Sequence, residues 1–178
     1  MDDLTALGLG LDHASVRVER TDEIWVRAGE ELRGRIAEAL RALAAGVEHI
    51  GSSSVRGLLA KPIIDLAVGL GPGQDLDLVR PRLDAGSWIY RGDAGAEGGC
   101  VFVLEARPWH RVAHLHVVGH GGQQWLDYLR FRDLLRTSAD ARSRYEAAKA
   151  RLASEYSRDR PAYISGKSVV VSELLSAS

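Results

Sequence analysis

The sequence predicts an α/β (α+β) fold, in which helices pack against a β-sheet. Apolar runs of strand length alternate with longer segments whose apolar residues recur at helical spacing. The chain has 178 residues, 46% hydrophobic and 26% charged, which is enough for one core of a soluble globular type. We therefore expect one domain over residues 1–178, with an irregular segment at 1–20 and helices over 123–178.

The first expected helix covers residues 22–45, where apolar side chains recur at intervals of three and four. Thr21 or Asp22 is placed to cap its start, and Gly46 to end it. The other elements are predicted from apolar runs, alternation and turn residues. They are strands at 47–50 and 63–68, a helix at 75–83, strands at 87–90, 101–106 and 112–118, and three helices between 123 and 175.

Charge and cysteine content exclude several classes of protein. Lys and Arg number 23 and Asp and Glu number 24, a net charge of −1, so overall charge does not favour a nucleic-acid partner. The single cysteine, Cys100, excludes an intrachain disulfide and a Cys-rich zinc site, which indicates a reducing, cytoplasmic location. No signal peptide or membrane-length apolar run is seen, so no membrane partner is expected, and the oligomeric state is not predicted.

The first candidate site is a glycine- and serine-rich loop at residues 51–57 (GSSSVRG), followed by Lys61. Backbone N–H groups, hydroxyls and the lysine could together hold an anion. Asp65 follows within an apolar strand, where a carboxylate is costly to bury unless it is paired or bound to metal. An ordinary turn and a satisfied core carboxylate would explain each piece alone, but the combination favours a site. Its binding residues would be Gly51, Ser52, Ser53, Ser54, Arg56 and Lys61.

The second candidate site is the sequence His114-Leu115-His116. Alternation along a strand puts both imidazoles on one face, with Cα atoms roughly 6.5 Å apart, close enough to share a metal ion or a substrate. The alternative is a pair of histidines facing solvent. His49 could join the same cleft, whereas His110 and His120 are expected at the surface.

Residues 47–66 (VEHIGSSSVRGLLAKPIIDL) closely resemble the signature of the GrpB-like family, which looks like a branch of the nucleotidyltransferase superfamily. The resemblance continues through 9–25, the histidine strand and three helical motifs, at 131–136, 145–149 and 159–167. It implies a nucleotidyltransferase-like mixed sheet with a helical C-terminal part. It also implies that Gly51 and Ser52 hold nucleotide phosphates. Three further contacts to phosphate or carboxylate are expected at Arg132, Lys149 and Lys167.

The resemblance further implies that Asp65 is the first metal-binding carboxylate, but the sequence departs from the superfamily pattern around it. Ala67 stands where a second acidic residue is expected, and His114 and His116 replace a third. Arg56 stands where the family usually has proline. A metal site would then be Asp65, His114 and His116, with Glu48 as a further ligand. The expected ion is Mg²⁺ or Mn²⁺, although this nitrogen–oxygen set also suits zinc, nickel or iron.

Three functions are compatible with these residues. The first is a nucleotidyltransferase-like enzyme that binds an NTP, or another phosphorylated or anionic small molecule, with a divalent metal, using Asp65, His114 and His116 as catalytic residues. The second is a scaffold that has kept the cleft but uses the two histidines for metal-dependent or acid–base chemistry on a small anionic substrate. The third is a non-catalytic nucleotide-binding domain. The loop favours the first.

Overall fold

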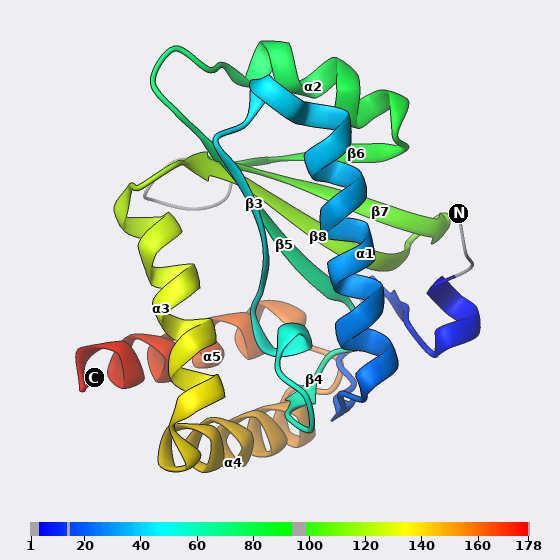
Figure 1. The fold of residues 1–178 in the computed structure, drawn as a ribbon. Coiled ribbons are helices and arrows are strands. Elements are labelled where there is room, and N and C mark those ends of the chain that lie inside the picture. The colour runs from blue at the N-terminus through cyan, green and yellow to red at the C-terminus, as the bar shows by residue number, and fades with distance from the viewer. Residues whose placement is uncertain (1–3, 14, 94–98, 178) are drawn as a thin grey trace.

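The structure, a computed structural model, describes residues 4–13, 15–93 and 99–177 (Figure 1). Three short 3₁₀ turns lie at Leu4–Leu7, Arg41–Leu43 and Ser52–Ser54. The strands are β1 (Leu11–Asp12), β2 (Glu19–Arg20), β3 (Gly46–Ile50), β4 (Leu59–Ala60), β5 (Ile64–Leu70), β6 (Trp88–Asp93), β7 (Cys100–Arg107) and β8 (His110–Gly119). The helices are α1 (Glu23–Leu40), α2 (Leu76–Ala85), α3 (Gln123–Thr137), α4 (Ala139–Glu155) and α5 (Arg160–Ser176).

The main sheet is mixed, which confirms the predicted class. Its strand order is β3-β5-β8-β7-β6, and β1 adds to the end of β8. Only the β5–β8 pair is parallel among the described strands, and its register places Asp65 beside His114 and Ala67 beside His116. Because side chains alternate across a sheet, these residues share one face. A separate two-stranded sheet joins β2 to β4.

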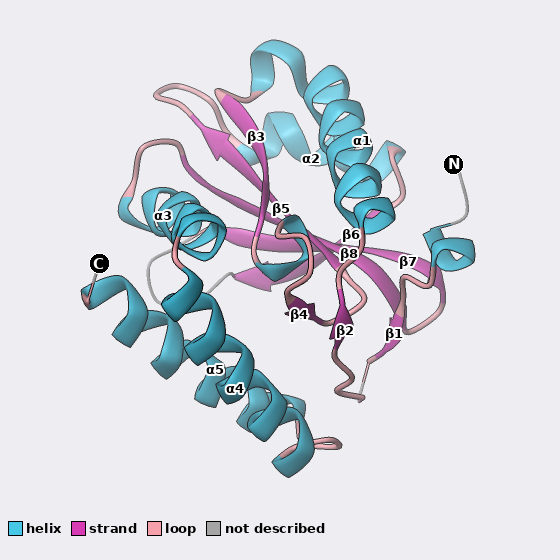
Figure 2. Cartoon of the chain, turned by 60° about the horizontal axis from the view of Figure 1, so that its bottom comes forward, coloured by secondary structure: helices cyan, strands magenta, loops and turns pink. Residues whose placement is uncertain are grey.

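Helices α1 and α2 cover one face of the sheet and bury the larger hydrophobic core (Figure 2). On α1 the buried residues Trp25, Leu32 and Ile36 recur at helical spacing, and the Asp22 side chain accepts a hydrogen bond from the Trp25 backbone N–H. The prediction that Gly46 ends this helix was wrong. The helix ends at Leu40, a 3₁₀ turn follows, and Gly46 instead begins β3.

Helices α3, α4 and α5 gather on the other side of the sheet (Figure 2). Trp125 of α3 packs on Ile50, Ala67 and Val118 of the sheet face, while a second cluster joins Phe131 of α3 to residues of α4 and α5. The three C-terminal helices are therefore as predicted. Within the described residues no helix is both long enough and apolar enough to cross a bilayer.

The short N-terminal elements were not predicted. Residues 4–13 and 15–20 fall within the segment expected to be irregular, yet they contain a 3₁₀ turn and the strands β1 and β2. Each of these strands has two residues, which is too short to show alternation in a sequence. Strand β1 pairs with β8 near His110, and β2 pairs with β4 directly after the serine loop.

Candidate functional site

A cavity of about 580 Å³ lies between the β5–β8 face of the sheet and helices α3 to α5. Its volume falls in the range typical of small-molecule sites. Among the described residues its wall carries six cationic side chains and two carboxylates. The cations are Lys61, Arg91, Arg111, Lys149, Arg160 and Lys167, and the acids are Asp65 and Asp127. The near-neutral chain therefore concentrates positive charge around one cavity.

Asp65 and His114 form a hydrogen-bonded pair at the floor of the cavity. The Nδ1 of His114 lies 3.0 Å from Asp65 Oδ1, and its Nε2 lies 3.3 Å from an Nη2 of Arg160. Because Arg160 only donates, Nε2 accepts and Nδ1–H donates to the carboxylate, which fixes a neutral imidazole tautomer. Burial, together with Arg160 and Lys61, lowers the pKa of His114 by more than Asp65 raises it, so the ring is neutral at pH 7. Burial also raises the pKa of Asp65, but the His114 hydrogen bond and nearby cations more than reverse this and hold it below its ordinary value.

The serine loop is shaped by Gly51 and by contacts to Asp65. Gly51 has φ 66° and ψ −167°, a conformation almost restricted to glycine, and a Cβ there would lie 3.1 Å from Asp65 Oδ2. The Ser53 hydroxyl accepts a hydrogen bond from the Asp65 backbone N–H at 3.1 Å and also bonds His49 Nε2 at 3.2 Å. Ser54 donates to the Gly51 carbonyl. Ser53 and Ser54 thus hold the loop, and Ser52 lines the cavity.

Lys149 is the most deeply buried cation of the site, with 2% of its surface exposed. Its ammonium donates to Ser52 Oγ at 2.8 Å and to the Leu59 carbonyl at 2.7 Å, both neutral acceptors. Burial, with Lys167 and Lys61 nearby, lowers its pKa well below the usual value. A bound anion would favour the protonated form of this buried lysine, whose hydrogen bonds now go only to neutral oxygens.

Lys61 and Tyr163 lie together on the wall of the cavity. The Lys61 ammonium is 4.9 Å from the centre of the Tyr163 ring, and burial, with Lys167 and Arg160 nearby, lowers the Lys61 pKa to about 7. The Tyr163 side chain is fully buried, and its hydroxyl has no hydrogen-bond partner among the described residues. Burial raises its pKa to about 12, so the hydroxyl is a free donor at neutral pH.

His116 lies in the cavity but not against Asp65. Its Nδ1 is 3.2 Å from the Tyr128 hydroxyl, and burial lowers its pKa to about 4. Phe131, Val101 and Val171 line the same end of the cavity, which is therefore more apolar than the lysine end.

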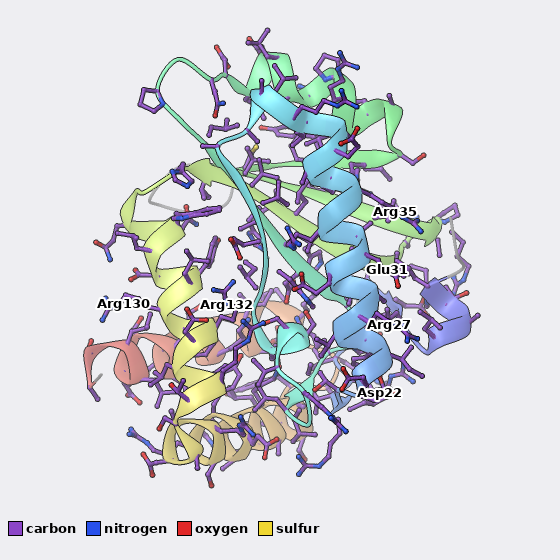
Figure 3. The ribbon with its side chains drawn as sticks, in the orientation of Figure 1. Asp22, Arg27, Glu31, Arg35, Arg130 and Arg132 are labelled. Atoms are coloured by element: carbon purple, nitrogen blue, oxygen red, sulfur yellow. The ribbon has the colours of Figure 1, made fainter. Side chains whose placement is uncertain are left out.

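Besides Ser53 and Ser54, three predicted site residues do not line the cavity: Glu48, Arg56 and Arg132. Arg132 donates to Glu48 Oε2 at 2.7 Å, so the two form an ion pair between α3 and β3; Figure 3 shows Arg132 on the side of α3 that faces β3, with Arg130 pointing away. Arg56 is an exposed side chain 3.1 Å from Glu23. Arg132, Glu48 and Arg56 are each in an ion pair with a residue outside the cavity wall.

The predicted metal ligands are not gathered in this arrangement. Asp65 is bonded to His114, His116 to Tyr128, and Glu48 to Arg132. Across residues 4–13, 15–93 and 99–177, no group of three or more His, Cys, Asp or Glu side chains could hold a metal ion. The residues as placed do not fit a divalent-metal centre, and the metal stays a prediction from the sequence.

Three cationic residues of the cavity were not predicted: Arg91, Arg111 and Arg160. Regular alternation along the strand does not predict the direction of Arg111, because β8 contains a β-bulge: Leu104 pairs with Ala113 while Glu105 pairs with Arg111. The extra residue in β8 changes which face Arg111 points to. Arg160 starts α5, beside a proline that signals a helix N-terminus but gives no hint of a binding role.

Two histidine predictions also need revision. His110 was expected to be a surface residue without a partner, yet its Nδ1 lies 2.8 Å from Asp12 Oδ1 and its side chain is 17% exposed. The pairing of β1 with β8 creates this contact. His49 is buried beneath α1, where its ring occupies the space above Gly29, so it supports the loop from behind and does not line the cavity.

Solved structures share this fold. The crystal structure of conserved protein GrpB from Enterococcus faecalis is 28% identical, covers 90% of this chain and 98% of its own, and has a TM-score of 0.76. The GLD-2/RNP-8 complex matches with a TM-score of 0.55 at 13% identity, over 85% of this chain and 58% of that one. The Cid1 poly(U) polymerase matches with a TM-score of 0.51 at 12% identity, over 76% and 43%. These last two likenesses show that the chain has the nucleotidyltransferase fold.

Sequence relatives place the chain in a family. A UPF0157 protein of Pseudomonas aeruginosa is 36% identical over 170 residues, covering 92% of this chain and 68% of the relative. A UPF0157 protein of Streptomyces coelicolor is 36% identical over 173 residues, covering 93% and 82%. The glutamate-rich protein GrpB of Alkalihalophilus pseudofirmus is 26% identical, covering 94% and 98%. Since the model of the GrpB protein family also matches residues 15–177, the chain belongs to the GrpB family.

Proposed function

We propose that this protein is a nucleotidyltransferase-like enzyme that binds a nucleotide in the cavity, with the phosphates against Ser52, Lys149 and Lys61. The observation that carries the proposal is Lys149, a buried ammonium whose hydrogen bonds all go to neutral oxygens. Among the described residues no salt bridge joins Lys61, Lys149 or Lys167 to a carboxylate. A polyphosphate would supply the negative charge that this end of the cavity lacks.

Two further features support a nucleotide over a bare anion. The Tyr163 hydroxyl is a buried donor without a partner, which a ligand oxygen would satisfy. The part of the wall with Tyr128, Phe131 and Val101 offers apolar and aromatic surface for the base and ribose. The cavity wall thus offers both the cationic and the apolar surface that a nucleotide requires.

The Asp65–His114 pair supports a transfer reaction on this nucleotide. Asp65 holds the neutral imidazole with Nε2 toward the cavity, so His114 is a general base once Arg160 releases that atom. An acceptor hydroxyl would give its proton to Nε2 while its oxygen bonds to the α-phosphorus. The bond from the α-phosphorus to the bridging oxygen would break, and pyrophosphate would leave with that electron pair. The surrounding lysines would stabilise the charge on the leaving group.

A second candidate function is acid–base chemistry on a small anionic substrate without nucleotidyl transfer. Ala67 favours it, because this residue is fully buried beside His116 and leaves Asp65 as the sole carboxylate on the described part of β5. Release of pyrophosphate from an NTP separates the two functions: the first requires it, and the second does not.

The test of nucleotide binding is calorimetry with ATP, GTP, CTP and UTP, with and without Mg²⁺, on the wild type and Lys149→Met. We expect at least one nucleotide to bind and Lys149→Met to weaken it about tenfold or more, since a hydrogen bond to a charged group contributes about 1.5–3 kcal/mol. Arg144→Met is the matched control, because Arg144 is an exposed cation on the same helix, paired with Asp140. Absence of binding by all four nucleotides, or equal binding by Lys149→Met and wild type, would refute the proposal.

A further inference from the structure

A cluster of three arginines lies on the part of the cavity wall formed by β6, β8 and the start of α5. Arg91 lies on β6, Arg111 on β8, and Arg160 at the start of α5, and all three line the cavity. Strand β3 leads into the serine loop, and β6 is four strands away in the sheet order. At roughly 4.8 Å between neighbouring strands, the two edges are about 19 Å apart. Arg91 is therefore far from the serine loop. Arg111 lies nearer, on β8, two strands from β3, and Arg160 contacts His114 on the side away from Asp65.

The backbone is shaped to bring Arg111 into this cluster. In a regular strand Arg111 would share the face of Ala113 and Leu115, both fully buried in the main core. The bulge in β8 at Val112 turns Arg111 to the cavity face, on the same side as His114. Bulges often re-aim a side chain next to a site, so the position of this guanidinium is built into the fold.

The cluster carries more positive than negative charge. Glu105 is the carboxylate beside it, 2.9 Å from an Nη2 of Arg91 and 3.7 Å from Nε of Arg111. The Nε of Arg111 is buried without a hydrogen-bond partner among the described residues. Arg160 donates to neutral acceptors, the His13 carbonyl and His114 Nε2. Asp65, beyond His114, also acts on Arg160. Three guanidinium groups against two carboxylates leave 3 − 2 = 1 positive charge.

A phosphate group fits this excess charge and this donor set. Guanidinium groups bind phosphate oxygens through two parallel N–H bonds, and a phosphate monoester carries about −1.5 to −2 charge at pH 7. We infer that Arg91, Arg111 and Arg160 form a second oxyanion subsite, which binds the phosphate group of a second substrate across the Asp65–His114 pair from the nucleotide. The role of that substrate as acceptor rests on the proposed function, whereas the subsite itself does not.

Binding of the second substrate would change the hydrogen bonding of His114. In the structure Arg160 donates to His114 Nε2, the atom that would accept a proton. A phosphate that draws Arg160 toward Arg111 would free this nitrogen. The second substrate would then prepare the base for its own reaction.

The test uses inorganic phosphate as the probe and calorimetry on the full chain. We expect wild type to bind two phosphates, Lys149→Met to keep the Arg111-dependent one, and Arg111→Met to keep the Lys149-dependent one. Each variant should weaken its own site by about tenfold or more, because one charged hydrogen-bonding group is lost. Arg107→Met is the matched control, since Arg107 is an exposed cation on the same hairpin, 2.9 Å from Asp12, and it should bind as wild type.

Three outcomes would overturn the inference: no phosphate binding at millimolar concentration, wild-type phosphate binding by Arg111→Met, or loss of all phosphate binding in Lys149→Met, which indicates one continuous site. Far-ultraviolet circular dichroism checks that each variant is folded. Failure of the nucleotide proposal is distinguishable from these outcomes. In that case every NTP fails to bind, while phosphate binding stays dependent on Arg111.

Discussion

Lys61 provides a quantitative test of the charge imbalance in the cavity. Its pKa is lowered from 10.5 to about 7 by burial and by the neighbouring cations Lys167 and Arg160. Between these two pH values the unfolded chain holds a proton on Lys61 that the folded chain has lost. The free energy of unfolding should therefore rise with pH in this interval, because the unfolded state binds more protons.

The size of this effect follows from the pKa. One proton bound only to the unfolded state changes stability by about 1.36 kcal/mol per pH unit. Between pH 7 and pH 9, with the folded group half protonated at the lower limit, the gain is about 2 kcal/mol. Lys61→Met removes the titrating group, so its stability should gain about 2 kcal/mol less than that of wild type over this interval.

Urea denaturation of both proteins at pH 7 and pH 9 measures this difference. Arg144→Met again serves as the control, because an exposed side chain meets water in the folded and unfolded states, and its stability should follow that of wild type. Equal pH dependence in Lys61→Met and wild type would refute the reasoning. The same lysine should gain a proton when an anion binds, so nucleotide affinity should fall as pH rises above about 7 in wild type and less so in Lys61→Met.

Two other substitutions test the geometry around the site. Gly51→Ala should lower the free energy of unfolding by about 1–3 kcal/mol because of the backbone conformation of Gly51. The loss should exceed that of Gly57→Ala, because a Cβ at Gly51 would press on Asp65 while a Cβ at Gly57 meets no atom within 4 Å. Equal losses in urea denaturation would contradict this. Arg132→Met should cost about 1–3 kcal/mol, since it breaks a half-buried bond to a carboxylate. Arg56→Met should cost less than about 0.5 kcal/mol, and the reverse order would contradict the assignment.

Much of the fold could be predicted because its elements are long enough to show periodicity. The buried face of α1 and the apolar run of β5 are readable from residue types alone. Alternation along a single strand also predicted that His114 and His116 share a face, and the parallel pairing of β5 and β8 puts Asp65 on that face. Two-residue strands and the bulge at Val112 leave no such pattern.

The composition of the site was harder to predict, because a charged side chain can pair with any of several residues that only the tertiary structure brings near it. Glu48 lies on β3, next to the strand that carries Asp65, but its carboxylate is paired with Arg132 of α3 and not with a metal site. Lys149 was expected from the family resemblance, whereas its burial depends on how α4 packs over Ser52. Arg91 and Arg160 are 69 positions apart in the sequence, and only the tertiary structure brings them to one cavity.

A structure of the protein with a bound nucleotide tests the central claim most directly. We predict phosphate oxygens within hydrogen-bonding distance of Ser52 Oγ and Lys149 Nζ, and the base toward Tyr128 and Phe131. A nucleotide bound outside this cavity, or one whose phosphates lie away from Lys149, would contradict it.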